Sequence, residues 1–162
     1  MLTPRFQIPK TTIQPGTLQR GYLLIEALVS ILIFSTGILA IFSLQAASIQ
    51  NSADAKYRAD ASFLANQIVG YMWGDRANLA AYVHQPGGAA CAPTGTPSTN
   101  VNVMSWLADV NSVLPNAAGA RQQITVNTTP GATNGTVTVT ICWNTPQSPA
   151  NRSYTAIAQI NG

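Results

Sequence analysis

The sequence predicts an α+β fold in which one long N-terminal α-helix packs on a small antiparallel β-sheet. Residues 22–44 are almost all apolar or small, and Glu26 is the only charged residue among them. Beyond them, apolar residues recur at spacings of three and four as far as Tyr71, the pattern of one helix face. Residues 122–160 contain three stretches in which apolar and polar residues alternate, which is typical of half-buried strands.

Charge is scarce in this chain and unevenly placed. Charged residues make up 8% of it, against roughly 25% in an ordinary soluble domain. The net charge of +3 belongs to residues 1–21, which hold three basic residues and no acid, because the remainder has five of each sign. No basic cluster exists to follow a phosphate backbone, so nucleic acid is not an expected partner. The positive-inside rule predicts a cytoplasmic N-terminus and an exported remainder. The three basic residues are Arg5, Lys10 and Arg20.

Residues 22–44 are predicted to span a membrane. As a helix they rise about 35 Å at 1.5 Å each, and a bilayer hydrocarbon core is about 30 Å thick. A carboxylate at the bilayer centre costs roughly 2.5–3.5 kcal/mol on insertion scales, and less near an interface. Glu26 therefore needs a compensating partner.

Residues 45–84 are predicted to continue the same helix with one face turned toward a folded domain. No proline occurs between Pro15 and Pro86, so a long helix is permitted as far as Trp73, and past a bend at Gly74 to Val83. The inward stripe is predicted to consist of Ile49, Ala53, Tyr57, Ala61, Leu64, Ile68 and Tyr71.

The solvent side of this amphipathic part carries two predicted ion pairs. Asp54 and Arg58, and likewise Lys56 and Asp60, are opposite charges four residues apart. Such pairs stabilise a helix by a few tenths of a kcal/mol each, about 0.2–0.5 kcal/mol.

Residues 85–162 are predicted to form the globular part. Residues 85–100 are rich in Pro, Gly, Ser and Thr and are predicted to be a loop. Residues 101–114 are predicted to form a short helix that Pro115 ends. Its apolar face is predicted to hold Met104, Leu107, Val110, Val113 and Leu114.

Three strands are predicted to follow, at residues 122–128, 136–143 and 152–160. Turn signals lie between the first two, at Pro130-Gly131 and Asn134-Gly135, and residues 144–151 form a loop with two prolines. The middle strand alternates most regularly: its apolar residues face one way, and its threonines and Cys142 the other. The apolar faces are predicted to be Ile124 and Val126, then Val137, Val139, Ile141 and Trp143, then Tyr154, Ala156, Ala158 and Ile160.

Two cysteines, Cys91 and Cys142, both fall in the exported part. In an oxidising compartment one disulfide is the simple interpretation. The alternative is two unpaired buried thiols.

The sequence offers no constellation typical of an enzyme, a metal site or a cofactor site. His84 is the only histidine and is predicted to be a surface or capping residue at a helix end. The four aspartates of the exported part are scattered, with no close pair to act as acid and base. The three tryptophans, Trp73, Trp106 and Trp143, suit core packing better than a sugar-binding platform.

The start of the chain holds a basic leader that ends in Gly21, followed by Tyr22 and by the acid Glu26 near the start of an apolar helix. These features together resemble the type IV pilin signal of pilins and pseudopilins. The matching string is GYLLIEALVSILIFSTGILAI. The resemblance implies that residues 1–21 are a leader, which a prepilin peptidase removes between Gly21 and Tyr22. It also implies that the same enzyme methylates the new N-terminus at Tyr22, where the family more often has phenylalanine.

The resemblance also implies a role for Glu26. In the family, this carboxylate pairs with the N-terminal amine of a neighbouring subunit as the pilin leaves the bilayer, and a partner charge offsets its desolvation. Within its own chain, Glu26 would lie in the first helical turn after cleavage, where the helix macrodipole favours an acid.

The rest of the chain is most similar to PilV-type minor pilins. The similar features are ILAIFSLQAASIQNS, ANQIVGYMWGDRANLAAY, a Trp-containing helix that ends in Leu-Pro, and Val-x-Ile-x-Trp in a strand. The implied protein is a single-pass inner-membrane subunit with a periplasmic domain, which joins other major and minor pilins in a pilus at the cell surface. Two alternatives stay open: a minor pseudopilin of a type II secretion system, and an anchored binding or adhesin domain that never polymerises.

Overall fold

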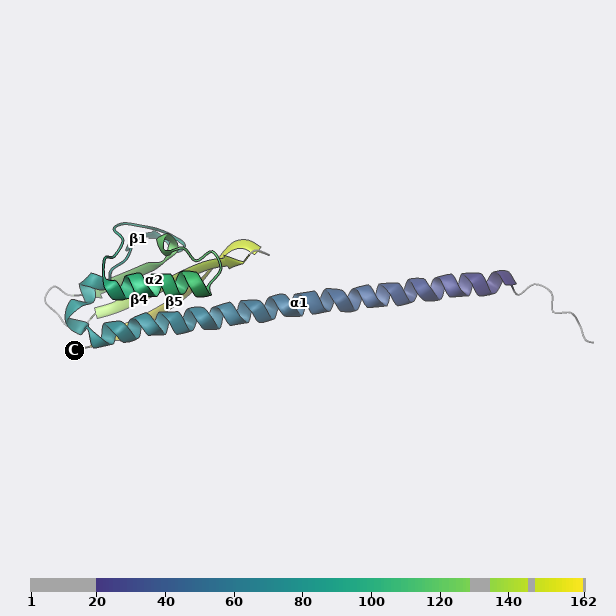
Figure 1. The fold of residues 1–162 in the computed structure, drawn as a ribbon, viewed down its shortest axis with the longest axis horizontal. Helices are drawn as coiled ribbons and strands as arrows, with labels where there is room; N and C mark the ends of the chain where they lie inside the picture. Colours follow the sequence, from purple (N-terminus) through teal and green to yellow (C-terminus); the bar gives the residue numbers. More distant parts are fainter. Residues whose placement is uncertain (1–19, 129–134, 146–147, 162) are drawn as a thin grey trace, which may run out of the picture. The chain divides into compact units, whose positions relative to one another are not determined.

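The computed structural model describes residues 20–128, 135–145 and 148–161. The predicted leader before Arg20, the turn at 129–134 and residues 146–147 lie outside these ranges. The chain divides into two compact units, one ending at Ile49 and the other beginning at Gln50. The fold is α+β as predicted (Figure 1).

One helix, α1 (Arg20–Gly74), runs through the end of the first unit and into the second. Its length of 55 residues follows from the absence of proline, which would remove a helical hydrogen bond. The helix ends at Gly74, where the Asp75 N–H donates to the Tyr71 carbonyl at 3.1 Å. Beyond Gly74 the chain forms a 3-10 helix, η1 (Arg76–Tyr82). The α-helix therefore ends one residue past Trp73, the nearer of the two predicted ends, and the segment after Gly74 continues as 3-10 and not as α-helix.

The second unit contains the hydrophobic core. Helix α1 contributes buried side chains to it, and the predicted residues Ala61, Leu64 and Ile68 are among them. The predicted stripe is wrong at both ends: Ile49 is 71% exposed, and Tyr71 is 43% exposed while Met72 is buried in its place. The buried residues of α1 are Ala61, Leu64, Ala65, Ile68, Val69 and Met72.

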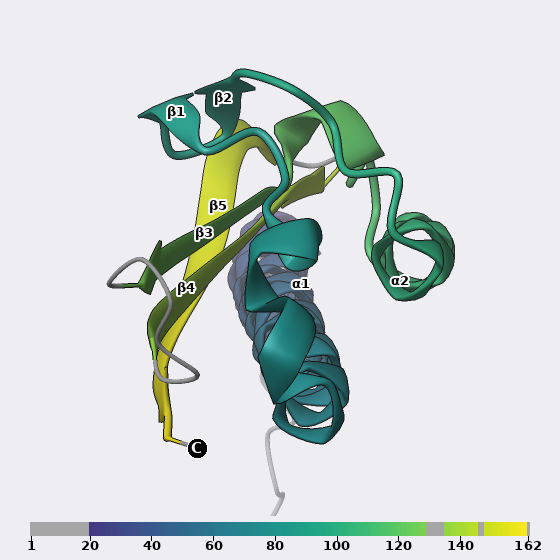
Figure 2. The same cartoon turned by 90° about the vertical axis from the view of Figure 1, so that its left-hand side faces the viewer.

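A three-stranded antiparallel sheet covers this part of α1. Its strands are β3 (Gln123–Thr128), β4 (Gly135–Thr145) and β5 (Ser148–Ile160), in the order β3-β4-β5. The predicted inward face of β4 is confirmed, because Val137, Val139, Ile141 and Trp143 are all buried. Figure 2 shows the sheet on one side of α1 and the helix α2 on another.

Helix α2 (Val101–Val113) begins at Asn100, whose side-chain oxygen accepts the N–H groups of Asn102 and Val103. Such a cap satisfies backbone donors that the first turn leaves unpaired. Its buried face consists of Val103, Trp106 and Val110. The predicted face is therefore wrong at Met104 and Val113, which are exposed, because more apolar residues follow the helical spacing than the helix can bury.

The predicted loop at 85–100 contains a short hairpin. Strands β1 (Gly87–Ala89) and β2 (Ala92–Thr94) pair antiparallel. Gly88 has a φ of +80°, and a Cβ atom there would lie 2.6 Å from the Ala92 carbonyl oxygen, so the turn requires glycine.

Only one of the two predicted ion pairs forms within α1. Lys56 Nζ lies 3.2 Å from Asp60 Oδ2, as predicted. Asp54 pairs with Arg152 of β5 instead of Arg58, at 2.9 Å between Arg152 Nη2 and Asp54 Oδ2. The folded sheet brings Arg152 to a carboxylate that helical spacing alone assigns to Arg58.

Candidate functional site

The apolar segment, residues 22–44 of α1, is the first part of the candidate site. All its residues are exposed in the isolated chain. Helix α1 is long and apolar enough to cross a membrane, with a mean hydropathy of 2.4 in its most apolar 18-residue window. Exposed leucine, isoleucine and phenylalanine side chains on every face of a helix are unfavourable in water. The segment therefore requires an apolar environment, which a bilayer or other apolar helices would supply.

Three hydroxyl groups of the apolar segment, those of Ser35, Thr36 and Ser43, are satisfied inside the helix. Ser35 Oγ donates to the Ile31 carbonyl at 2.7 Å, and Ser43 Oγ donates to the Leu39 carbonyl at 3.0 Å. Thr36 Oγ1 lies 2.9 Å from the Ile33 carbonyl oxygen. Because these donors use backbone acceptors within one turn, they do not need water, and the segment can enter an apolar phase without leaving them unpaired.

Glu26 is different, because it is the only charged side chain between Tyr22 and Leu44. It lies in the second turn of α1, four residues after Tyr22, so the two side chains share a face of the helix. The helix macrodipole acts mainly on the first turn, so it contributes little at Glu26 in the uncleaved chain. The Gly21–Tyr22 bond, the predicted cleavage site, lies in the first turn of α1.

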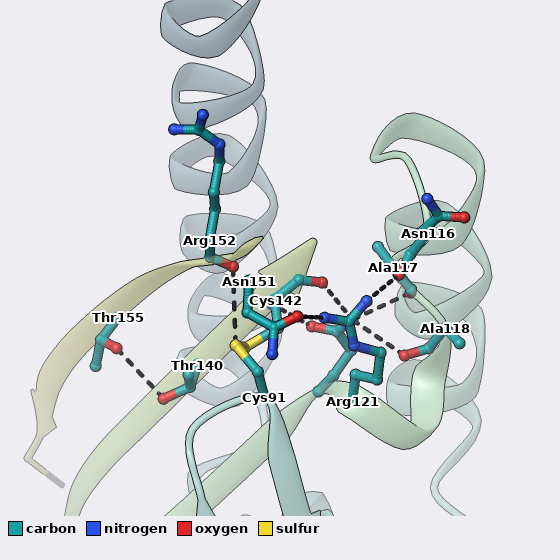
Figure 3. Close-up of a disulfide and its surroundings, with 11 residues drawn as sticks. Cys91, Asn116, Ala117, Ala118, Arg121, Thr140, Cys142, Asn151, Arg152 and Thr155 are labelled. Carbon is teal, nitrogen blue, oxygen red and sulfur yellow. Dashed lines mark hydrogen bonds between the residues drawn. A yellow bond between two sulfur atoms is a disulfide. The ribbon is translucent and has the colours of Figure 1, made fainter. Parts of the chain in front are cut away.

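The second predicted pair of site residues forms a disulfide. Cys91 and Cys142 are joined, as the simpler interpretation of the sequence predicted (Figure 3). Cys91 lies in the turn between β1 and β2 with a φ of +65°, and Cys142 is buried in β4. The bond thereby ties the hairpin to the middle strand of the sheet.

Two side chains beside this disulfide, the buried Gln122 and the partly exposed Arg121, were not identified from the sequence. The Gln122 side chain hydrogen-bonds the backbone of Cys142 and of residues 117 and 118. The Arg121 guanidinium binds the Asn116 carbonyl and the Asn151 side chain (Figure 3). No sequence signal marks Gln122, because a glutamine before a strand is ordinarily exposed.

His84 is buried, so the prediction of a surface or capping residue is wrong. Both ring nitrogens have backbone partners. The Ser98 N–H donates to Nδ1 at 3.1 Å, and Nε2 lies 3.1 Å from the Gly119 carbonyl oxygen. A backbone N–H can only donate, so Nδ1 is the acceptor and Nε2 carries the proton that it donates to Gly119.

The predicted role of the tryptophans is confirmed for two of the three. Trp106 and Trp143 are buried in the core, and Trp106 Nε1 donates to the Leu64 carbonyl of α1 at 2.8 Å. Trp73 is 43% exposed and does not belong to the buried core.

Tyr82 has a clearly altered acidity. Burial raises the pKa of its phenol, and the negative charge of Asp75 acts in the same direction. A hydrogen bond from Asn102 Nδ2 to the phenol oxygen, 2.9 Å long, partly opposes this rise of the pKa. The phenol in turn lies 3.3 Å from Asp75 Oδ2, so Tyr82 links the end of α1 to helix α2.

Among the residues that the structure describes, no group of three or more His, Cys, Asp or Glu side chains is placed to hold a metal ion. Comparison with protein-family models, with curated proteins and with solved structures gives no match to this chain.

Proposed function

We propose that the chain is a minor pilin, a structural subunit that is cut after Gly21 and inserted through its apolar segment into a type IV pilus. The observation that carries the proposal is a single carboxylate, Glu26, in an otherwise uncharged and fully exposed helical segment. A charge in such a place is costly unless a partner charge reaches it. An N-terminal amine of a neighbouring subunit, created by cleavage before Tyr22, is the partner proposed.

The second unit supports the same proposal. It is a compact domain with its own core, and helix α1 continues into it without a break. The disulfide suits a domain exported to an oxidising compartment. The domain would travel on the polymerising helix and make lateral contacts outside the membrane.

The proposal is tested by replacing Glu26 with Ala or with Gln in the producing cell. Removing one partner of a desolvated ion pair costs about 3–5 kcal/mol, so incorporation into sheared pili should fall by more than about tenfold. Membrane insertion should stay unchanged, because both variants make the segment more apolar. The matched control is Ile25→Ala, which alters a neighbouring exposed position without touching the charge.

Two results would overturn the proposal. One is a mature N-terminus other than methylated Tyr22, which removes the processing step. The other is wild-type incorporation of both Glu26 variants. If the protein is processed and anchored but never enters a filament, the anchored binding domain is the better description.

A further inference from the structure

We propose that His84 is an acid-sensitive latch that holds residues 95–100 against the folded unit. This inference is independent of the proposed function, because it rests on the second unit alone. It begins from the position of the ring, which is buried where three segments meet. These are the segment with Ser98, the 3-10 helix η2 (Gly119–Arg121) and strand β3.

The backbone of His84 is fixed independently of its ring. His84 and Ile124 exchange two backbone hydrogen bonds, of 3.0 Å and 2.9 Å, which form an isolated bridge to β3. The ring therefore stays at the junction whatever its protonation state. Its two nitrogens act on the other two segments.

Protonation affects those two contacts differently. The Nε2–H bond to the Gly119 carbonyl survives, because an imidazolium still donates there. The contact to Ser98 does not, since a proton taken from solvent by Nδ1 occupies the lone pair that accepts the Ser98 N–H. The protonated Nδ1–H of His84 and the backbone N–H of Ser98 then face each other, and the Ser98 N–H is left without an acceptor.

The surroundings give the imidazolium no compensating anion. Residues 85–100 and strand β3 carry no charged side chain. The charged residues of η1 and η2 are both basic. Arg76 donates a hydrogen bond to the Asn161 carbonyl, and Arg121 donates to the Asn116 carbonyl and the Asn151 side chain. The acids next to η1 and on α2 have partners of their own: Asp75 contacts Asn78 and Tyr82, and Asp109 lies 3.5 Å from Gln67 Nε2.

Release of Ser98 would loosen a defined part of the chain. Besides the His84 contact, Ser98 donates its hydroxyl to the Ala81 carbonyl at 2.8 Å, and the Gln85 N–H donates to Thr96 at 3.1 Å. The disulfide at Cys91 keeps the hairpin attached in either state. Acid is therefore expected to mobilise residues 95–100 around Ser98 and to leave β4 in place.

Hydrogen exchange of the full chain in detergent micelles tests the latch. Mass spectrometry would compare segment 85–100 with β4 from about pH 8 to about pH 5, the range in which histidine side chains change charge. Protection factors remove the intrinsic dependence of exchange on pH. In wild type, the protection of residues 95–100 within this segment should fall about tenfold relative to β4 as the pH falls.

Two variants make the result decisive. His84→Asn places a non-titrating oxygen near Nδ1, so its segment 85–100 should show no selective loss of protection in acid, whatever its overall stability. Ser98→Ala keeps the backbone N–H that binds His84, so it should retain the wild-type response. Equal acid profiles in wild type and His84→Asn, or a wild-type loss spread evenly over β4, would overturn the proposal.

Discussion

The Gln122 side chain and the Cys142 backbone exchange two hydrogen bonds: Gln122 Nε2 donates to the Cys142 carbonyl at 3.0 Å, and the Cys142 N–H donates to Oε1 at 2.7 Å. Pairing of β3 with β4 ends at Gln123 and Thr140, so no strand faces Cys142 on that side. The amide of Gln122 occupies the place of a peptide group and closes this part of the β4 edge. An open edge would present unpaired backbone groups to other chains.

Replacing Gln122 with Leu should therefore destabilise the folded unit. The change keeps the volume but leaves the buried N–H and carbonyl of Cys142 without these partners. An unsatisfied buried group costs about 1–3 kcal/mol, so the free energy of unfolding should fall by about 2–4 kcal/mol. Guanidinium unfolding followed by tryptophan fluorescence measures it. The control is Gln159→Leu, at an exposed position of β5, where a change of no more than about 0.5 kcal/mol is expected.

Removing the disulfide by the double change Cys91→Ala and Cys142→Ala should lower stability by about 4 kcal/mol. The bond closes a loop with a sequence separation of 51, and chain entropy in the unfolded state gives this magnitude. Thermal unfolding of the variant and of reduced wild type should agree. A loss below about 1 kcal/mol in both would show that other contacts already restrain the hairpin, among them the bond from Gln123 to Gly87.

The sequence predicted burial best where the side-chain pattern depends on one helix or strand alone. Alternation along β4 identifies its buried face, because side chains in a strand alternate sides whatever their neighbours are. It was less informative at β5, which begins at Ser148 and not at Arg152. Pro149 lowers the strand signal there, yet an edge strand tolerates proline.

The residues of the candidate site show the same contrast between local sequence signals and long-range contacts. Glu26 is marked by being the only charge in one helical segment, and Tyr22 by the resemblance of that segment to the pilin signal. His84 and Gln122, in contrast, depend on segments far apart in the sequence. The β1–β2 hairpin was missed because its strands have three residues each and contain the glycines and proline that ordinarily signal a loop. Such features follow from tertiary contacts, which periodicity does not encode.

The ion pair between Asp54 and Arg152 should be worth more than the pair between Lys56 and Asp60. Arg152 and Asp54 are each about one-third exposed, at 34% and 32%, whereas Lys56 is 68% exposed. Water screens the more exposed pair more strongly, and holding its long side chain costs entropy. Double-mutant cycles with Asn and Gln should give a coupling of about 0.5–1 kcal/mol for the first pair and less for the second.

Salt provides the check on both couplings. Each should shrink as ionic strength rises from about 0.01 M to about 1 M, because the Debye length falls from about 30 Å to about 3 Å. Equal couplings for the two pairs at low salt, or a coupling at Asp54 that salt does not change, would contradict this account of the link between α1 and β5.

Tyr82 should make the folded unit sensitive to alkali. Its pKa is raised in the folded state, by burial first and by Asp75 as well, above the usual value of about 10 in the unfolded chain. The stability that comes from this raised pKa is fully present below about pH 10 and is lost as the pH rises through the folded-state value. Unfolding free energies measured from about pH 8 to about pH 11 should therefore fall less steeply for Tyr82→Phe than for wild type.

At neutral pH the same variant should be less stable than wild type by about 1 kcal/mol, because the phenol no longer accepts from Asn102 or contacts Asp75. The two stability curves should then converge in alkali. Gln122→Leu is the matched control, since it destabilises the fold while Tyr82 keeps its phenol, so its alkaline slope should equal that of wild type. Parallel curves for wild type and Tyr82→Phe would show that the phenol ionises equally well in the folded and unfolded chain, against the burial that the structure gives it.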